Sequence, residues 1–178
     1  MKELQEFPLD QYPDVKSLCV EVIKRFSRTD LHNSNALRYD SGGVPTTPEA
    51  QFKEEFYAAA KKLLGDRIVL SSEWSNDGEG RIDFRIVNTK WGVELLRNGD
   101  RLAEHCGRFE PGGLYYGAID RGDMIDWLVI DCTHLKPRRF TAFPNAKLVR
   151  AVFAEDYSSA EILDAYNVVV APMFPLLS

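Results

Sequence analysis

The sequence predicts an α/β fold in which helices flank both faces of a mixed β-sheet. With 178 residues, 44% of them hydrophobic, the chain is long enough to bury a core of its own. Two helix-forming segments come first, and three strand-like segments then follow one another as a meander. A later apolar strand, WLVIDC, returns after a further helix, and this order favours a sheet with both parallel and antiparallel pairs.

The N-terminal part is predicted to contain an amphipathic helix and a linker. Within residues 13–28, apolar side chains recur at helical spacing, namely Val15, Leu18, Cys19, Val22 and Phe26. Residues 30–47 are rich in turn-forming residues and indicate a linker. We therefore divide the chain into residues 1–46, a helix with a linker, and residues 47–178, the main domain, and expect the two to pack as one globular unit.

A second helix is predicted to begin at TTPEAQ. Thr47 is a suitable N-cap, Pro48 suits the first helical position, and Glu49 interacts favourably with the helix dipole. The helix is expected to end near Gly65, because glycine readily adopts the left-handed conformation that closes a helix.

Alternation of apolar and polar residues predicts the strands of the meander. In RIDFRIV, Ile82, Phe84 and Ile86 share one face, so Asp83 faces the other way. The continuous apolar run WLVIDC suits a strand that is covered on both faces. From residue 67 onward, the expected elements are strands at 67–75, 81–87 and 90–96, a helix at 101–109, strands at 127–132 and 147–153, a helix at 158–166 and a strand at 167–172, with residues 110–123 as a loop.

Composition narrows the classes of function. The net charge of −5 argues against a generic nucleic-acid coat protein, although a local basic cleft is compatible with it. Three cysteines without metal-ligand spacing favour a reducing, intracellular compartment over a disulfide framework or a zinc module. The N-terminal segment lacks the pattern of a signal peptide, and no apolar run reaches the roughly 18 residues of a membrane span, so we expect no membrane partner.

Two acids stand out in GRIDFRIVNTKWGVELLRNG, residues 80–99. Asp83 and Glu94 lie on strands that are expected to pair, so both carboxylates can converge on one face of the sheet. Two close carboxylates repel each other unless a cation lies between them, and Mg²⁺ is commonly held by one or two carboxylates with waters and substrate phosphates. The alternative is that both acids are solvated or paired with arginines, Arg81, Arg85 and Arg97.

The second helix offers a third acid. Its apolar stripe includes Phe52 and Phe56, and at about 100° per residue Glu54 points away from this stripe whereas Glu55 lies at its edge. Glu55 is therefore the candidate that can reach over the sheet, and an ordinary paired charge at the rim of the helix is the alternative.

These elements resemble the restriction-endonuclease-like PD-(D/E)XK nuclease core, with its αβββαβ order. The segments EAQFKEEFYAAAKKLL, GRIDFRI, KWGVELLRNG, EHCGRF, GGLYY and DWLVIDC are more specifically similar to the nuclease-like domain of Crinkler-type effector proteins and their fungal relatives. The resemblance spans roughly residues 48–135, so the first 45 and last 40 residues are not covered by it.

The resemblance implies cleavage of phosphodiester bonds with Mg²⁺ or Mn²⁺. Asp83 matches the first metal-binding acid, Glu94 matches the acid of the (D/E)XK triplet, and Glu55 matches a glutamate often found on the first core helix. The triplet here reads Glu94-Leu95-Leu96, so a leucine stands where the family has a lysine that stabilises charge at the phosphate.

Another cation is expected to substitute for that lysine if the domain is active. Lys90 lies on the same strand face as Glu94, and His105 and Arg108 lie on the helix that follows. His105 is nearest to the apolar border of this helix and can approach the acids, although a structural histidine bonded to backbone is an equal alternative.

Basic side chains are expected to contact nucleic acid, with DNA as the partner and RNA as an alternative. The candidates are Arg97, Arg108, Arg138 and Arg139, of which the last two lie in the basic segment KPRRF. An ordinary solvated loop is the other interpretation of that segment. The resemblance also implies an effector that acts in the nucleus of a host cell. A catalytically inactive module that binds nucleic acid or a host protein, and a structural interaction domain, remain as alternative functions.

Overall fold

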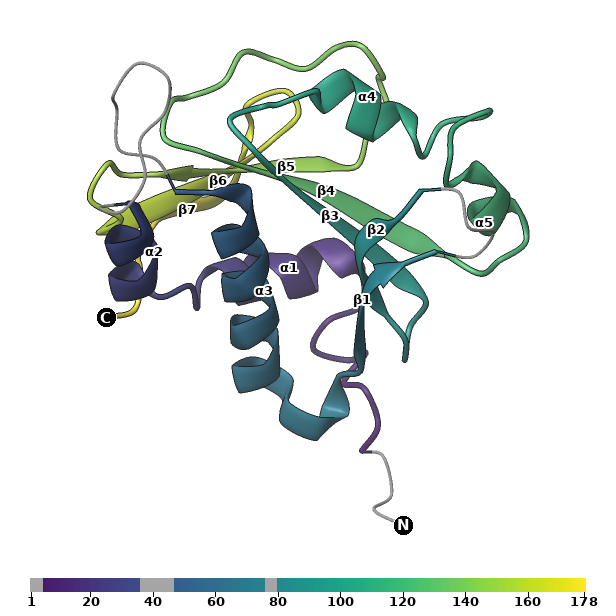
Figure 1. The fold of residues 1–178 in the computed structure, drawn as a ribbon, viewed down its shortest axis with the longest axis horizontal. Coiled ribbons are helices and arrows are strands. Elements are labelled where there is room, and N and C mark those ends of the chain that lie inside the picture. The colour runs from purple at the N-terminus through teal and green to yellow at the C-terminus, as the bar shows by residue number, and fades with distance from the viewer. Residues whose placement is uncertain (1–4, 36–46, 76–79) are drawn as a thin grey trace.

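The computed structural model of the protein describes residues 5–35, 47–75 and 80–178. In this part of the chain, seven strands form one sheet whose spatial order follows the sequence (Figure 1). The strands are β1 (Leu70–Trp74), β2 (Ile82–Ile86), β3 (Trp91–Arg97), β4 (Asp126–Thr133), β5 (Leu148–Phe153), β6 (Ser159–Asp164) and β7 (Val169–Pro175).

The sheet is mixed, as the sequence predicts. Strands β1 to β3 form an antiparallel meander, β3, β4 and β5 run parallel to one another, and β5 to β7 are again antiparallel. The helices are α1 (Val15–Ile23), α2 (Arg28–Asn35), α3 (Glu49–Leu64), α4 (Leu102–Gly107) and α5 (Tyr116–Asp120), with a short 3₁₀ turn, η1 (Gly65–Arg67), after α3. The parallel central strands need crossover connections, and α4 and α5 lie in the crossover between β3 and β4.

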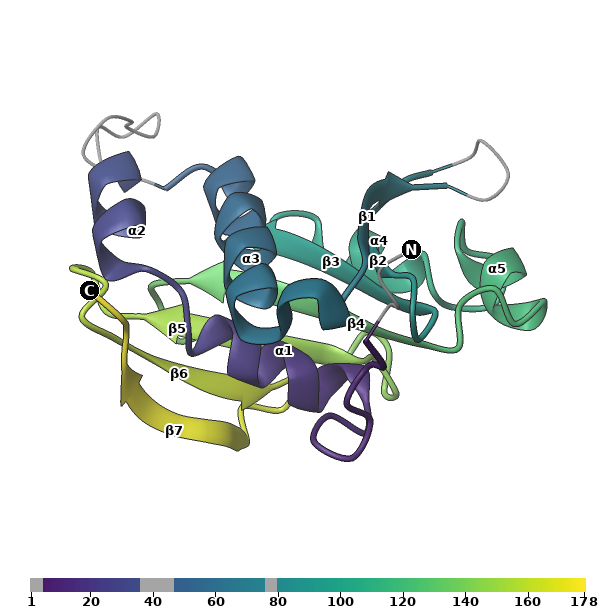
Figure 2. The same ribbon diagram turned by 90° about the horizontal axis from the view of Figure 1, so that it is seen from below.

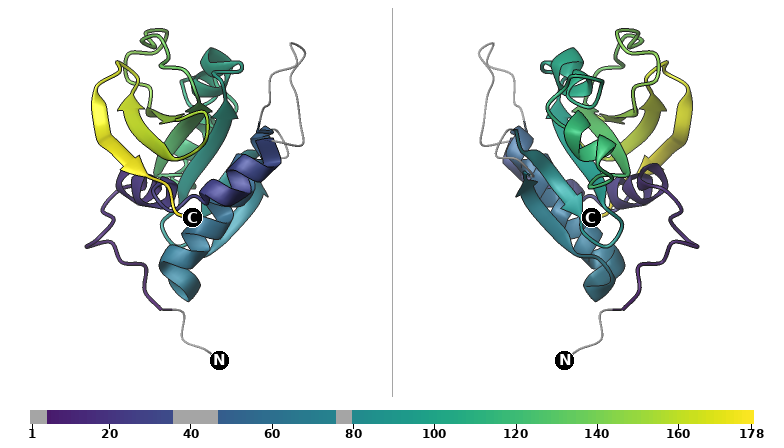
Figure 3. Two further views of the ribbon diagram at one scale, coloured as in Figure 1. Left: turned by 90° about the vertical axis from the view of Figure 1, so that its left-hand side faces the viewer. Right: turned by 90° about the vertical axis from the view of Figure 1, so that its right-hand side faces the viewer.

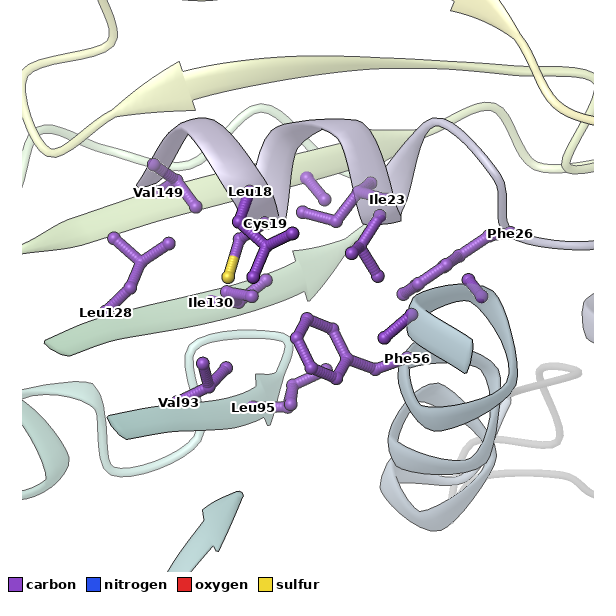
Figure 4. Close-up of a cluster of buried hydrophobic side chains, with 14 of the residues drawn as sticks. Leu18, Cys19, Ile23, Phe26, Phe56, Val93, Leu95, Leu128, Ile130 and Val149 are labelled. Carbon is purple, nitrogen blue, oxygen red and sulfur yellow. The ribbon is translucent and has the colours of Figure 1, made fainter. Parts of the chain in front are cut away.

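One face of the sheet is covered by α1 and α3, which Figures 2 and 3 show together on the same side. Helix α1 begins with a capping box between Asp14 and Ser17, in which each side chain binds the backbone of the other residue. Its apolar stripe, predicted from the sequence, then packs against α3 and the central strands. Figure 4 shows this cluster, which includes Leu18, Cys19, Ile23, Phe26, Phe56, Val93, Leu95, Leu128, Ile130 and Val149.

The other face carries a second apolar cluster under α4, α5 and the segment between β4 and β5. Leu96 of β3 is buried in it beside Cys106 of α4, and Val129 of β4 lies in the same cluster. Helices therefore cover both faces, as expected, and the residues of β3 alternate between two buried environments. Because β3 and β4 are covered on both sides, the side chains of Glu94 in β3 and Asp131 in β4 are buried.

The structure corrects the secondary structure expected for three segments. Residues 158–166 were expected as a helix but contain strand β6, which pairs with both β5 and β7. The expected linker at 30–47 begins with helix α2, and the expected loop at 110–123 contains helix α5. Residues 36–46 of the linker and 76–79 of the turn between the first two strands lie outside the described residues.

Helix boundaries agree with the caps expected for α3 to within one residue. Pro48 occupies the N-cap position and Glu49 begins the helix, while Gly65 closes it with a φ of 55°. The Thr47 hydroxyl, expected as the cap, instead bonds the carbonyl oxygen of Leu31 and the hydroxyl of Tyr157. Within the described residues, no helix is long and apolar enough to cross a membrane.

Replacing Leu18 by alanine tests the packing of α1 against the sheet. The Leu18 side chain is completely buried, so we expect Leu18→Ala to lower the free energy of unfolding by about 2–5 kcal/mol in urea titrations. Leu135→Ala is the matched control, because Leu135 is 79% exposed, and its effect should stay within about 0.5 kcal/mol. Equal effects of the two substitutions would contradict the placement of α1 in the core.

Candidate functional site

The pairing of β2 with β3 ends where the two acids lie. Hydrogen-bonded partners run from Ile86–Trp91 to Phe84–Val93, after which β3 continues beside β4. Asp83 is the next residue of β2, and its Oδ2 accepts a hydrogen bond of 2.8 Å from the backbone N–H of Leu95. A side-chain carboxylate thus accepts the N–H of β3 at the point where the pairing of β2 with β3 ends, while β2 remains paired with β1.

The other oxygen of Asp83 is paired with a lysine from α3. Lys53 Nζ lies 2.8 Å from Asp83 Oδ1 and 2.9 Å from Glu49 Oε1, so one ammonium group bridges two carboxylates. Lys53 was missed by the sequence analysis. Its spacing of four residues from Glu49 indicated a helical ion pair, but only the placement of α3 over the sheet brings it to Asp83.

Glu94 is buried under α4, with 2% of its surface exposed. Its Oε1 accepts a hydrogen bond of 2.7 Å from Arg108 Nη1 and contacts His105 Nδ1. Arg108 also binds Oε1 of the exposed Glu104, at 2.9 Å, which fixes its guanidinium group above β3. The second oxygen of the buried carboxylate, Glu94 Oε2, has no hydrogen-bond partner among the described residues.

The electrostatics of Asp83 show that the two acids interact. Burial raises the pKa of Asp83 above its usual range, and the negative charge of Glu94 adds to this rise. The Lys53 ammonium group and the Leu95 N–H act in the opposite direction. The pKa of Asp83 is therefore set mainly by its burial and by Lys53, with a smaller contribution from Glu94 on the adjacent strand.

The arginines considered as partners of the acids bind elsewhere. Arg81 pairs with Glu73, and Arg85 donates to the carbonyl oxygen of Asp123. Arg97 Nη1 donates to the carbonyl oxygen of Thr47. The side chains beside Asp83 and Glu94 are instead Lys53, His105 and Arg108.

Glu55 is buried and Glu54 is exposed, as the helix register predicts. The Glu55 carboxylate accepts a 2.9 Å hydrogen bond from the backbone N–H of Ser27 and a 3.4 Å bond from Gln51 Nε2. Ser27 directly precedes α2, so these contacts hold the junction of α1 and α2 against α3. That Glu55 supports a metal stays a prediction. Its observed contacts, with Ser27 and Gln51, are structural.

The residues expected to replace the lysine that is missing at Leu96 differ in their distance from the acids. Leu96 itself is buried among apolar side chains. Lys90 is exposed in the turn before β3, with a φ of 58°, whereas His105 and Arg108 both reach Glu94. Arg138 and Arg139 are exposed in the segment between β4 and β5.

The donor set suits a hard divalent cation that is shared with a substrate. Within the described residues, no group of three or more His, Cys, Asp or Glu side chains is arranged to hold a metal. Carboxylate oxygens are nevertheless the ligands that Mg²⁺ and Mn²⁺ prefer, with waters and phosphate oxygens completing the coordination. Asp83 and Glu94 therefore supply donors of a suitable kind, without a closed protein cage among the described residues.

Comparisons with protein-family models, with curated proteins and with solved structures found no match to this chain. We therefore infer the function of this chain from the chemistry of Asp83, Glu94 and the side chains beside them.

Substitution of Lys53 tests the electrostatic description of Asp83. We expect Lys53→Met to raise the pKa of Asp83 further, because the ammonium group that lowers it is lost while burial and the charge of Glu94 remain. The pKa is measured by titrating the side-chain carboxyl carbon in NMR spectra. Lys62→Met, on the same helix but exposed, should leave it unchanged. Indistinguishable titration curves for the two variants would show that Lys53 does not act on Asp83.

Proposed function

We propose that this protein is a metal-dependent nuclease that hydrolyses phosphodiester bonds of DNA. The observation that carries the proposal is the pair of acids on adjacent strands, Asp83 and Glu94. Glu94 keeps one buried oxygen without a hydrogen-bond partner among the described residues, and Lys53, His105 and Arg108 lie beside the two carboxylates. The order of α3, β1 to β3, α4 and β4 supports the finer assignment to a restriction-endonuclease-like core. The effector context and the nuclear destination of the resemblance belong to the same proposal.

The roles of the residues follow from their chemistry. Asp83 and Glu94 would hold Mg²⁺ or Mn²⁺, which when bound supplies an activated water and neutralises charge on the phosphate. Lys53 pairs with Asp83 and Arg108 pairs with Glu94, so either can bind the phosphate oxygens in the place of the lysine that Leu96 replaces. His105 bonds Glu94 and fixes the orientation of its carboxylate.

Activity measurements on isosteric variants test this function. We expect wild-type protein to nick plasmid DNA with Mg²⁺ or Mn²⁺, and Asp83→Asn and Glu94→Gln to be slower by about 100-fold or more, since a bound metal supplies several kcal/mol of transition-state stabilisation. Nicking is followed on agarose gels, and melting curves check that each variant is folded.

Asp126→Asn is the matched control for these variants. Asp126 is also a largely buried, ion-paired strand acid, with Lys147 Nζ at 2.6 Å from Oδ1, but it lies at the start of β4. This variant should nick at the wild-type rate. Nicking that survives both Asp83→Asn and Glu94→Gln would place the activity at another site or in a contaminant.

Metal binding should depend on pH through Asp83. Because burial raises the pKa of Asp83, protons compete with Mn²⁺ for its carboxylate, and the affinity should fall as the pH is lowered from neutral through that raised pKa. Calorimetric titrations at several pH values measure this trend, and Asp83→Asn should bind Mn²⁺ weakly and with less dependence on pH. Affinity that is independent of pH and of Asp83 would exclude this carboxylate as a ligand.

A second candidate is a catalytically inactive module of the same fold that binds nucleic acid or a host protein. The observation that favours it is that Asp83 and Glu94 already have protein cations as partners, while Leu96 occupies the lysine position. Calorimetry separates the two functions. Intact acids that give no heat with Mn²⁺ would favour the inactive module, whereas Mn²⁺ binding with nicking would favour the nuclease.

A further inference from the structure

The segment between β4 and β5, residues 134–147, is long and contains neither helix nor strand. In Figure 1 it forms the green arch that passes over the sheet beside α4. Extended loops without secondary structure are uncommon in compact domains and are usually functional when they are ordered. This segment, which we call the arch, is therefore a candidate for a role beyond the acids of β2 and β3.

The arch is basic although the protein is acidic. It carries Lys136, Arg138, Arg139 and Lys147 and no Asp or Glu, whereas the whole chain has a net charge of −5. All four basic residues of the arch are exposed, so their charges face solvent. Positive charge concentrated in this way attracts an anionic partner locally, although the net charge of the whole protein is negative.

The backbone of the arch is held from below by two polar side chains. Arg150 Nη1 donates to the carbonyl oxygen of Arg138 at 2.6 Å, and Asn167 Nδ2 donates to the carbonyl oxygen of Pro137 at 2.8 Å. Arg150 Nη1 also lies 3.1 Å from Asn167 Oδ1, so the two braces are joined. With these carbonyl groups bound inside, the side chains of Arg138 and Arg139 are directed outward.

The turn between β6 and β7 adds two further anchors. The backbone N–H of Phe140 donates to the carbonyl oxygen of Ala165 at 2.7 Å, and Tyr166 Oη donates to the carbonyl oxygen of Pro144 at 2.9 Å. Both halves of the arch are therefore fixed to one hairpin, and Phe140 is buried beneath it.

Arg150 is an unusual residue to find in this position. Only 1% of its surface is exposed, and its Nε has no hydrogen-bond partner among the described residues. Burying a guanidinium group costs free energy that Asp131, beside it on β4, offsets through its opposite charge. The hydrogen bonds of its Nη1, to the carbonyl oxygen of Arg138 and to Asn167, connect Arg150 to the arch.

The arch adjoins the site of Glu94. A Cβ atom at Gly107 would lie 3.2 Å from the ring of Phe143, so the arch packs directly on the end of α4. The next residue is Arg108, which binds Glu94. A chain of phosphates bound along the arch therefore passes beside the helix that carries Arg108 and His105.

We propose that the arch is a preformed binding surface for the phosphate backbone of a nucleic acid, with Lys136, Arg138 and Arg139 as contacts and Arg150 and Asn167 as positioning residues. The choice of nucleic acid as the partner rests on the proposed nuclease function. A fixed loop loses little conformational entropy on binding, and phosphate contacts position a duplex without reading its sequence.

Binding measurements without divalent metal test the contact residues. We titrate protein into a fluorescein-labelled DNA duplex in EDTA and expect Arg138→Ala/Arg139→Ala to bind about tenfold more weakly at low salt. The slope of log affinity against log salt should become shallower by about 1.5, since each lost phosphate contact removes roughly 0.7–0.9. Arg28→Ala/Arg121→Ala is the control, because it removes two exposed, ion-paired arginines and the same charge, and should change affinity less than about twofold.

Asn167→Gly tests the positioning role separately. Asn167 has a φ of 64°, which glycine adopts readily, so the variant keeps the turn and loses the amide that holds Pro137. We expect trypsin to cleave faster after Arg138 and Arg139, DNA affinity to fall by a few-fold, and the salt slope to stay unchanged because all contact charges remain. Arg150→Met should act in the same direction if it folds.

The outcomes separate this surface from the nuclease activity. Wild-type protein that nicks plasmid but binds DNA equally well with Arg138→Ala/Arg139→Ala overturns the arch surface and retains the nuclease. Binding that depends on the arch without any nicking retains the surface and overturns the nuclease. Absence of DNA binding at low salt overturns the proposed surface. Unchanged trypsin cleavage and unchanged DNA affinity in Asn167→Gly overturn the positioning role of Asn167.

Discussion

The buried charge of Glu94 is the constraint on which the site depends. Its carboxylate lies in a strand that is covered on both faces, where an unpaired charge would cost several kcal/mol. Helix α4 offsets this cost by bringing Arg108 and His105 to one carboxylate oxygen, so the position of α4 over β3 and the charge of Glu94 require each other. The second oxygen has no hydrogen-bond partner among the residues that the structure describes.

Asp83 extends the same arrangement to the other face of the sheet. By accepting the hydrogen bond of Leu95 N–H, it ends the pairing of β2 with β3 without leaving that donor unsatisfied. By binding Lys53, it links β2 to α3, which also packs on the core through Phe52 and Phe56. The two acids therefore lie on the neighbouring strands β2 and β3, between α3 on one face of the sheet and α4 on the other.

Local patterns predicted the strands and the register of α3, because apolar periodicity reports which face of an element is buried. They were wrong for β6, since Ile162 and Leu163 fit a short helix as well as a strand and only pairing with β5 and β7 decides between them. The apolar border of its helix allowed two interpretations of His105, an approach to the acids or a structural histidine bonded to backbone, and the structure shows a contact with Glu94. Lys53 was not anticipated, because its partner is on another element and its position depends on how α3 packs.

The buried ionisable side chains on the face of the sheet that α4 and the arch cover indicate a requirement other than stability. Glu94 and Arg150 are each enclosed by protein, and each retains a polar atom without a partner among the described residues. Well-packed apolar residues at such positions are often neutral or stabilising, so ionic groups persist there at a cost. Arg150 holds the arch and Glu94 holds α4, and the two elements are packed against each other at Gly107 and Phe143. One polar layer thus fixes both the candidate metal site and the basic surface beside it, so a change in either buried charge should affect the other through the shared contact.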